Sequence, residues 1–546
     1  MIYFLYFLFA VGWLAIPQVV SAVPVVQQVM NAASNVSPTL PNGSLAPGSI
    51  FIVKGTGLGP AALIVAPNPF QSTTLGGTSV AVTIGSTRVD ALMYYTSDKQ
   101  IAALLPSNVP SGGGTITVTY NGSASTATAI RGVAANNLGI FTIDSTGGGP
   151  GIVTYADYSL VSPFRAPNCS GPNTTCGAAN PGDTLILWGT GLGAVSGSDA
   201  TGAGLGQNMP NVPLQLWVGG AMAQIVYQGR SGCCIGEDQI VFTVPTTAAT
   251  GCAVPLMARI ANQVSNQVTI PIAPRGRTCL TELPGVSAET LTVPFSFGVV
   301  ELDHFLNDNG VGFRDEAKIF FARIPSVPPI LQPYVAAMQS EHIAGTCIVE
   351  NGTEVGFNAV LTDAALLDGG SSFAIRGPNG NLTVQGGSGN KVPLGTSGSF
   401  MVPGSYTITS NGGRDVGPFT ANLTLPPTPS LLTPARANLT LNRAQGLTVT
   451  WNPNGSNGQV EIQLSAKDSF NVSTVNVICT APASAGTFTI PPYATLALPT
   501  TSNAEFRFQP GDHGPAAQSE FTASGLSFGI AQIFAGNVAF AGIPVN

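Results

Sequence analysis

Short apolar segments separated by Gly, Pro and Asn turns are the main pattern of this chain. The segment PGSIFIVKGTGLG (47–59) is an example, in which a Pro-Gly turn opens an apolar run and a glycine-rich turn closes it. Apolar runs of this length, spaced by turn residues and lacking a helical period, are typical of the strands of a small β-sandwich. The best helix candidate is short, at 333–342. The pattern therefore predicts an all-β protein of tandem immunoglobulin-like β-sandwiches with at most one or two short helices.

The first half of the chain contains an internal repeat. The segment 47–59 returns as PGDTLILWGTGLG at 181–193, and DKQIAALLP (98–106) returns as EDQIVFTVP (237–245). A strand-and-turn pattern that occurs twice in the same order indicates two copies of one structural unit. Both GTGLG segments are interpreted as turns rather than phosphate loops, because no amphipathic helix follows either of them.

The second half lacks this repeat but keeps the pattern of strands and turns. Residues 289–302 and 316–325 are expected to be strands, and Asn454-Gly455 is typical of a hairpin turn. The proline-rich stretch 426–435 is interpreted as a linker. The predicted units are sandwiches at 23–135 and 136–275, a β-rich domain with an acidic loop at 276–425, and an immunoglobulin- or fibronectin-like sandwich at 426–546.

The repeat, together with the segment between its copies, resembles a known family. PGSIFIVKGTGLGP (47–60), the strand ending at Pro106 and the bridge LGIFTIDSTGGGPGIVTYADYSLVSP (138–163) are similar to the IPT/TIG-like immunoglobulin repeats of secreted acidobacterial (Solibacter-type) proteins. The resemblance covers roughly 23–274 and implies the fold and an extracellular location. Domains of this type also occur in transcription factors, but that use requires basic DNA-contacting loops, which this chain lacks.

The N-terminus and the composition narrow the function classes. Residues 2–16 are uninterruptedly apolar and Val20-Ser21-Ala22 follows, so we interpret 1–22 as a secretory signal, with an uncleaved anchor as the alternative. Beyond it, no apolar run is long enough to span a bilayer. Charged residues are only 8% of the chain, with 19 Lys+Arg against 26 Asp+Glu, which argues against disorder and nucleic-acid binding. The 66 Gly and 43 Pro argue against a coiled coil.

Eight cysteines fit an oxidising compartment. We expect disulfides Cys169–Cys176, Cys279–Cys347, and one of Cys233 and Cys234 with Cys252. Cys479 is expected to stay free and buried, because sandwiches joined by a proline-rich linker usually extend; pairing across a domain boundary is the alternative. A zinc site is not predicted, since no CxxC occurs and the three histidines are not spaced as ligands.

The densest acidic stretch, 302–318, is the best candidate for chemistry. It contains Asp303, His304, Asp308, Asp315 and Glu316. An EF-hand loop is excluded, because Gly310 at position 6 would place Phe305 at the first ligand position. We interpret the stretch as a solvated loop; a looser calcium site or a carboxylate pair for glycoside hydrolysis is the alternative.

Two other motifs are weaker. Trp188, Trp217 and Trp451 could stack on sugars, but each lies in an apolar strand pattern that favours core packing. Gly525-Leu526-Ser527-Phe528-Gly529 matches G-x-S-x-G, yet the last histidine, His513, precedes the serine, so the match is attributed to chance.

These observations predict a secreted or cell-surface immunoglobulin-like protein with a binding, adhesion or structural role. Its partner would be an unidentified protein or glycan, and neither nucleic acid nor a membrane span is expected after signal cleavage. No catalytic residue, cofactor or metal is predicted, and the oligomeric state is left open. The alternative function is an extracellular carbohydrate-active enzyme with catalytic residues in 276–425 and the repeats as accessory modules.

Overall fold

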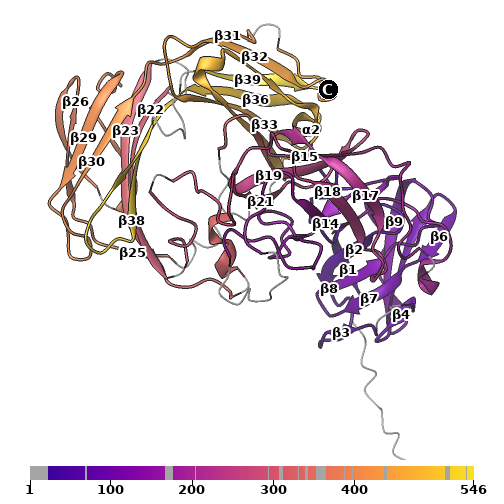
Figure 1. Ribbon diagram of the computed structural model, residues 1–546. Helices are drawn as coiled ribbons and strands as arrows, with labels where there is room; N and C mark the ends of the chain where they lie inside the picture. Colours follow the sequence, from indigo (N-terminus) through magenta and orange to yellow (C-terminus); the bar gives the residue numbers. More distant parts are fainter. Residues whose placement is uncertain are drawn as a thin grey trace, which may run out of the picture.

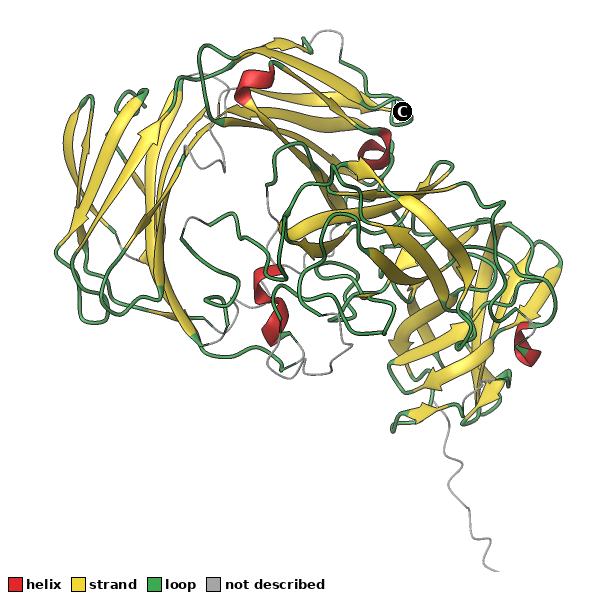
Figure 2. Cartoon of the chain, viewed as in Figure 1, coloured by secondary structure: helices red, strands yellow, loops and turns green. Residues whose placement is uncertain are grey.

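The computed structural model describes residues 23–546 except for short gaps, and residues 1–22 with the expected signal lie outside it. The gaps are 68–70, 166–175, 203, 284, 293, 307–311, 330, 338–341, 352–363, 387, 396–397, 436–438, 511–516 and 537. The predicted fold class is confirmed: the regular secondary structure of the described chain is almost entirely β-strand, with a few short helices and many connecting loops (Figure 2). The expected helix at 333–342 is the short 3₁₀ helix η2 (Gln332–Ala337), and the next four residues lie in a gap. None of the helices described has the length and apolar character that crossing a membrane requires.

The first sandwich packs two antiparallel sheets around Phe51, Val80 and Val118, all of which are fully buried. One sheet has the order β1 (Val25–Asn31), β2 (Ile50–Thr56), β8 (Gln100–Leu104), β7 (Leu92–Thr96), β3 (Ile64–Val65). The other has the order β10 (Ser123–Ala124), β9 (Gly112–Tyr120), β5 (Thr78–Ile84), β4 (Thr74–Leu75), with β11 (Thr128–Val133) on β9 and β6 (Thr87–Asp90) on β5.

The second sandwich repeats this arrangement, since β14 pairs with β18 as β2 pairs with β8. One sheet has the order β12 (Gly139–Ile140), β14 (Thr184–Thr190), β18 (Asp238–Thr243), β17 (Gln224–Arg230), with β13 (Val153–Thr154) on β14. The facing sheet has the order β16 (Ala221–Met222), β15 (Leu214–Val218), β19 (Gly251–Ile260), β20 (Gln263–Val264), with β21 (Val268–Ile272) on β19. A short 3₁₀ helix, η1 (Asp199–Thr201), lies between β14 and β15.

The third sandwich is built around two long strands. Its larger sheet has the order β25 (Ala365–Leu366), β23 (Phe313–Ile324), β22 (Phe295–Leu306), β38 (Phe528–Gly536), β37 (Gln518–Phe521), with β28 (Ser388–Pro393) on β23. The facing sheet has the order β27 (Gly380–Gln385), β26 (Ser372–Gly377), β29 (Gly404–Ser410), β30 (Phe419–Leu425). Phe321, Phe373 and Ile533 are completely buried between the two sheets.

The fourth sandwich also packs two sheets. One has the order β24 (Cys347–Glu350), β34 (Thr474–Pro482), β33 (Gln459–Lys467), β36 (Thr501–Pro510), β39 (Val538–Val545), and the other has the order β31 (Ser430–Thr433), β32 (Leu447–Asn452), β35 (Thr487–Ile490). The 3₁₀ helix η4 (Ala483–Ala485) and the one-turn helix α2 (Pro492–Thr495) flank β35.

The boundary predicted at 425/426 does not separate the last two sandwiches. β38 runs parallel to β22, with Phe297 opposite Phe528 and Phe305 opposite Gly536, so a strand from beyond the boundary completes the third sandwich. In the other direction, β24 from before the boundary pairs with β34 of the fourth. The chain therefore passes between the two sandwiches more than once, which a boundary drawn from composition alone misses.

Two local predictions for the fourth sandwich were also wrong. β32 and β33, which flank Asn454-Gly455, lie in different sheets and do not form a hairpin. Both turn residues do have positive φ, 52° and 77°, but the six-residue connection lets the chain cross from one sheet to the other. Part of the expected linker is the strand β31, which pairs with β32.

The four sandwiches fold back on one another instead of extending in a row. Figure 1 shows the fourth sandwich (yellow) between the third (orange) and the first two (indigo to magenta). Val36 and Leu40 of the first sandwich and Met257 of the second belong to the same buried apolar cluster as the core of the fourth. Trp217 of β15 stacks on Tyr493 of α2, with ring centroids 4.8 Å apart. The expectation of an extended arrangement was therefore wrong.

Candidate functional site

The acidic stretch 302–318 is mostly strand rather than the predicted solvated loop, with Asp308 in a gap between described residues. β22 and β23 pair along twelve residues, and the register places Asp303 opposite Glu316 and His304 opposite Asp315. Because side chains alternate between the faces of a sheet, these two pairs lie on opposite faces. The acidic residues consequently form two small clusters instead of one.

Asp315 and His304 lie on the face that packs against the second sheet of the sandwich. The Asp315 carboxylate is 3% exposed and accepts the N–H groups of Phe400 and Met401 at 2.7 and 2.9 Å. Its other oxygen contacts His304 Nδ1, and the imidazole stacks on Phe313 with centroids 4.5 Å apart. A carboxylate whose oxygens are all engaged by the fold is a structural anchor, because a general acid or base must be able to reach a substrate.

Asp303 and Glu316 lie on the outer face, where β28 supplies Lys391. Lys391 Nζ lies 2.6 Å from Asp303 Oδ2 and 3.8 Å from Glu316 Oε2. Burial, together with the neighbouring negative charge of Glu301, raises the pKa of Asp303 to about 6. Glu301 in turn accepts a hydrogen bond from Gln532 of β38 at 2.9 Å. Asp303 is fully buried beneath the lysine, so this network holds β22, β23, β28 and β38 together rather than presenting paired carboxylates to a substrate.

A second cluster of buried charge lies where the first two sandwiches meet. Arg230 pairs with Asp238, and both side chains are almost completely buried. Arg230 also donates to the Gly193 carbonyl at 2.7 Å, while Asp238 accepts the Leu192 N–H at 2.7 Å. The pair therefore fixes the second GTGLG turn, whose Gly191 and Gly193 have φ near 120°. This confirms the interpretation of that segment as a turn.

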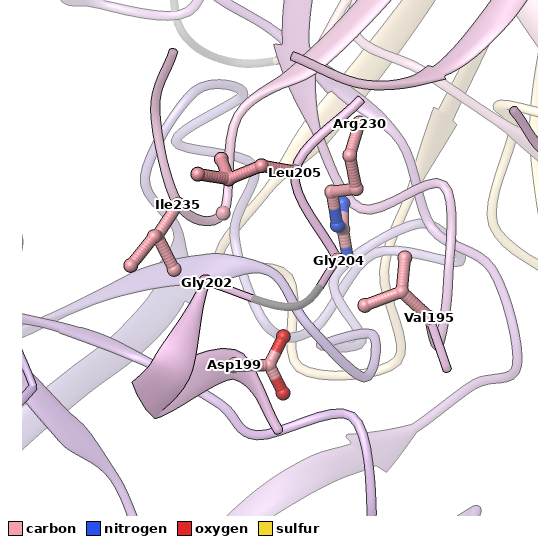
Figure 3. A pocket seen from close by; sticks show the side chains of 8 residues that line it. Val195, Asp199, Gly202, Gly204, Leu205, Arg230 and Ile235 are labelled. Carbon is pink, nitrogen blue, oxygen red and sulfur yellow. The ribbon is translucent and has the colours of Figure 1, made fainter. Parts of the chain in front are cut away.

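Arg230 borders a small pocket, lined by Val195, Asp199, Gly202, Gly204, Leu205, Arg230, Ile235 and Gly236 (Figure 3). Asp199 accepts the Ser107 N–H at 2.7 Å and its hydroxyl at 3.0 Å, so this carboxylate joins the second sandwich to the first. Thr190 reinforces the same junction, accepting the Ile50 N–H at its hydroxyl (2.9 Å) and the Asn31 amide at its carbonyl (3.0 Å). Sequence analysis missed this junction because Asp199 and Ser107 are 92 residues apart.

The disulfide pairing differs from the prediction. Cys252 pairs with Cys279, Cys347 with Cys479, and Cys233 with its neighbour Cys234. Cys347 and Cys479 face one another in register because β24 is the edge strand beside β34, so Cys479 is not free. Cys176 is disulfide-bonded, and its predicted partner Cys169 lies in a gap. No cysteine among the described residues is a free thiol.

Cys233, Cys234 and Glu237 form a group of three whose ligand-type atoms approach within 4.8 Å. The two sulfurs are joined to each other, however, and a metal binds thiolates rather than a disulfide. This arrangement does not fit a metal centre while the bond is intact.

The tryptophans differ in their surroundings. Trp451 is 2% exposed and donates to the Ala483 carbonyl at 2.6 Å, and Trp217 is stacked at the junction with the fourth sandwich, as core packing predicts. Trp188 is only partly buried, and its ring lies 6.2 Å from that of Tyr158, a residue that is 66% exposed. Sequence analysis missed Tyr158, which lies in the turn after the short strand β13.

The G-x-S-x-G match has a structural explanation. Ser527 Oγ accepts the Ser296 N–H at 3.1 Å and so joins the start of β38 to β22. His513 lies in a gap.

Comparison with known families gives a match within the first sandwich. An IPT/TIG domain model matches residues 33–131. A comparison with curated proteins gives no match. Among solved structures, the chain is similar to domains 4–9 of the surface layer protein SbsC, with 11% identity over 92% of this chain and 71% of that chain and a TM-score of 0.19.

Two further similar structures are SGBP-B proteins of glycan utilization loci. The protein from Bacteroides ovatus, solved with a mixed-linkage heptasaccharide, has 10% identity over 67% of this chain and 72% of that chain, with a TM-score of 0.20. The protein from a complex xyloglucan utilization locus of Bacteroides uniformis has 9% identity over 94% of this chain and 100% of that chain, with a TM-score of 0.15.

Proposed function

We propose that this chain is an extracellular or cell-surface protein of immunoglobulin-like domains with a binding, adhesion or structural role. The observation that carries the proposal is the way the sandwiches are fastened together. β38 and β24 are exchanged between the third and fourth sandwiches, and the first two pack on the fourth. Such interlocking fits a rigid scaffold that presents its outer surfaces to a partner.

The cysteines support the extracellular part of the proposal. Disulfides persist in oxidising compartments, and the described cysteines are all bonded. The apolar segment 2–16 and the resemblance of 23–274 to repeats of secreted acidobacterial proteins support the same location.

The alternative of a carbohydrate-active enzyme has less support. Asp303 and Asp315 in the proposed catalytic region are buried and engaged by Lys391 and by backbone N–H groups, respectively. The remaining acidic candidates of that stretch are Asp308, which lies in a gap, and Glu316, which lies 3.6 Å from Arg314 and 3.8 Å from Lys391.

The test combines localisation, adhesion and turnover. The full chain is expressed in the organism that encodes it, and its distribution is measured between cytoplasm, cell surface and medium. The purified protein starting at residue 23 is then incubated with intact cells and with a panel of polysaccharides. We expect export, sedimentation with cells and no release of sugars. Cytoplasmic retention with reduced thiols, or hydrolysis that Asp308→Ala abolishes without unfolding, would contradict the proposal.

A further inference from the structure

Figure 1 shows the sheet of β14, β18 and β17 in the second sandwich. The aromatic pair of Trp188 and Tyr158 lies at the face of this sheet that points away from the core of the sandwich. Leu185 and Leu187 of β14 are fully buried in the core of the second sandwich. Trp188 follows Leu187 and, by the alternation of a strand, lies on the other face, where it is only partly buried. Its indole N–H donates to Thr154 Oγ1 at 3.0 Å, which fixes the ring and satisfies its polar atom. The hydrogen bond to Thr154 therefore fixes the orientation of the Trp188 ring.

Tyr158 stands next to Trp188 in the turn that follows β13. Its N–H donates to the Tyr155 carbonyl at 3.0 Å, and the Tyr155 N–H donates to the Ser159 carbonyl at 2.9 Å, so the turn is closed from both sides. The two rings are 6.2 Å apart and tilted by 43°. This geometry forms a shallow aromatic platform with Tyr158 as its exposed part.

The backbone of Tyr158 is strained. Its φ is +64°, a left-handed conformation that costs a side chain with a Cβ about 1 kcal/mol or more relative to glycine. Because 66% of the residue is exposed, burial of the ring offsets little of this conformational cost. Strain at an exposed aromatic residue points to a role outside folding stability.

A polar partner lies beside the platform. Gln239 of β18 is directly opposite Trp188 in the register, and residues in this relation share a face of the sheet. The Gln239 side chain is partly exposed and makes no hydrogen bond to any described residue. Its amide can therefore both donate to and accept from a ligand that rests on the two rings.

The charged side chains of the turn and of the strand below it are engaged within the protein. The next outward positions of the sheet, Ile186 and Val241, are apolar. Arg277 is engaged by Asp183 and by the Tyr155 hydroxyl. Asp157, which precedes Tyr158 in the turn, accepts the N–H and the hydroxyl of Ser159 at 3.0 and 2.6 Å. A phosphate-bearing ligand would need unpaired cations, and a cationic ligand would need unpaired carboxylates.

We propose that Trp188, Tyr158 and Gln239 form a binding site for a neutral carbohydrate chain; this inference rests on the proposed binding function. A pyranose ring presents a face of C–H groups with partial positive charge, which is attracted to the negative faces of aromatic rings. The hydroxyl groups of the sugar both donate and accept hydrogen bonds. They can therefore pair with the side-chain amide of Gln239, which also does both. A proline-rich peptide is disfavoured because it binds in grooves between aromatic rings, whereas this platform is a single tilted pair of rings.

The experiment is affinity electrophoresis of the full secreted chain in native gels that contain hydroxyethyl cellulose, xylan, galactomannan or starch. We expect retardation by at least one polysaccharide. Trp188→Ala should weaken that affinity at least about tenfold, as loss of an aromatic anchor does, and Gln239→Ala about two- to tenfold, as loss of a hydrogen bond does. Tyr94→Ala is the matched control, because it removes a 37% exposed tyrosine from the first sandwich and should leave binding unchanged.

Tyr158→Gly separates binding from folding. Glycine relieves the positive φ, so this variant should melt at the same temperature as the unmodified chain or above it, yet bind at least about tenfold more weakly. Tyr158→Phe keeps the ring and should retain binding. Absence of retardation by every polysaccharide, binding that survives both Trp188→Ala and Tyr158→Gly, or capture of a proline-rich peptide by this face instead would each overturn the inference. If the carbohydrate site is overturned in this way, the chain can still be tested for adhesion to cells whose glycans have been oxidised by periodate. Adhesion to such cells would support the proposed binding function without a carbohydrate ligand.

Discussion

Several ionisable side chains of the second half are buried at contacts between segments far apart in the sequence. His342 is an example. Its backbone N–H donates to Glu282 Oε2 at 2.8 Å, and its ring Nδ1 lies 3.2 Å from Glu461 Oε2 of β33. Burial raises the pKa of Glu282 to about 7. Burial alone would favour the neutral imidazole, but the hydrogen bond and charge of Glu461 outweigh it and raise the pKa of His342. The folded protein therefore holds protons here that the unfolded chain releases.

The first prediction follows from these protons. A group whose pKa is higher in the folded protein than in the unfolded chain stabilises the fold while it is protonated. This stabilisation is complete at a pH below the unfolded pKa, and it is lost as the pH rises through the folded pKa. For Glu282 this window runs from 4.5 to about 7, and the raised pKa of His342 acts in the same direction above 6.5. The unfolding temperature should therefore fall between pH 5 and pH 8 in differential scanning calorimetry. Glu282→Gln, which imitates the protonated acid, should flatten the decline; an unchanged slope in this variant would assign the effect to other groups.

Arg230 and Asp238 support a second prediction at the same scale. Asp238→Asn leaves the buried guanidinium without its countercharge, so the second sandwich should lose about 3–5 kcal/mol of stability. The double variant Arg230→Met, Asp238→Leu removes both charges and should recover most of that loss. Denaturant unfolding followed by tryptophan fluorescence measures both effects. A single variant as stable as the unmodified protein would show that the pair is solvated rather than buried.

At the scale of elements, the edge strand β24 has a larger role than its four residues suggest. It extends the fourth sandwich by pairing with β34, and the bond between Cys347 and Cys479 locks this pairing. The bonded residues are 132 apart in the sequence, against 27 for Cys252 and Cys279. Closing the longer loop removes more entropy from the unfolded chain.

The third prediction compares these two disulfides. Cys347→Ala with Cys479→Ala should cost up to about 5 kcal/mol, and Cys252→Ala with Cys279→Ala up to about 3.5 kcal/mol, by loop-closure entropy. Calorimetry of the two double variants gives the order of the effects. A larger loss from the shorter loop would mean that local packing dominates.

Thiol titration of the denatured, unreduced parent should find none of the described cysteines free.

At the scale of the whole molecule, buried contacts hold the sandwiches in a folded-back arrangement. Met257 of the second sandwich lies in the apolar cluster of the fourth, and Thr39 Oγ1 of the first contacts Ser473 Oγ at 3.3 Å. Contacts of this kind bind sandwiches far apart in the sequence into one body.

The fourth prediction concerns this shape. Small-angle scattering should give a radius of gyration near the roughly 24 Å of a compact chain of this length, well below that of four sandwiches in a row. Trp217→Ala with Tyr493→Ala removes the stacked pair between the second and fourth sandwiches and should enlarge the radius. An extended profile for the unmodified protein would show that these contacts do not hold in solution.

The sequence by itself determined the features that depend on short-range physics. The alternation of apolar runs and turns specified the all-β class, and the repeat of 47–59 at 181–193 specified two similar units, with β2 and β14 as equivalent strands. Turn chemistry is local, so the positive φ angles of Gly57, Gly191 and Gly193 followed from the residues alone.

Only the tertiary structure decided which strands pair, and with them the cysteine partners and the candidate sites. Backbone hydrogen bonds are the same for every strand, so no local pattern in β38 specifies β22, more than two hundred residues away, as its neighbour. Cys479 meets Cys347 because β24 joins β34. Tyr158 and Gln239 meet Trp188 because a turn and a neighbouring strand bring them to one face, and such meetings depend on contacts that form between segments far apart in the sequence.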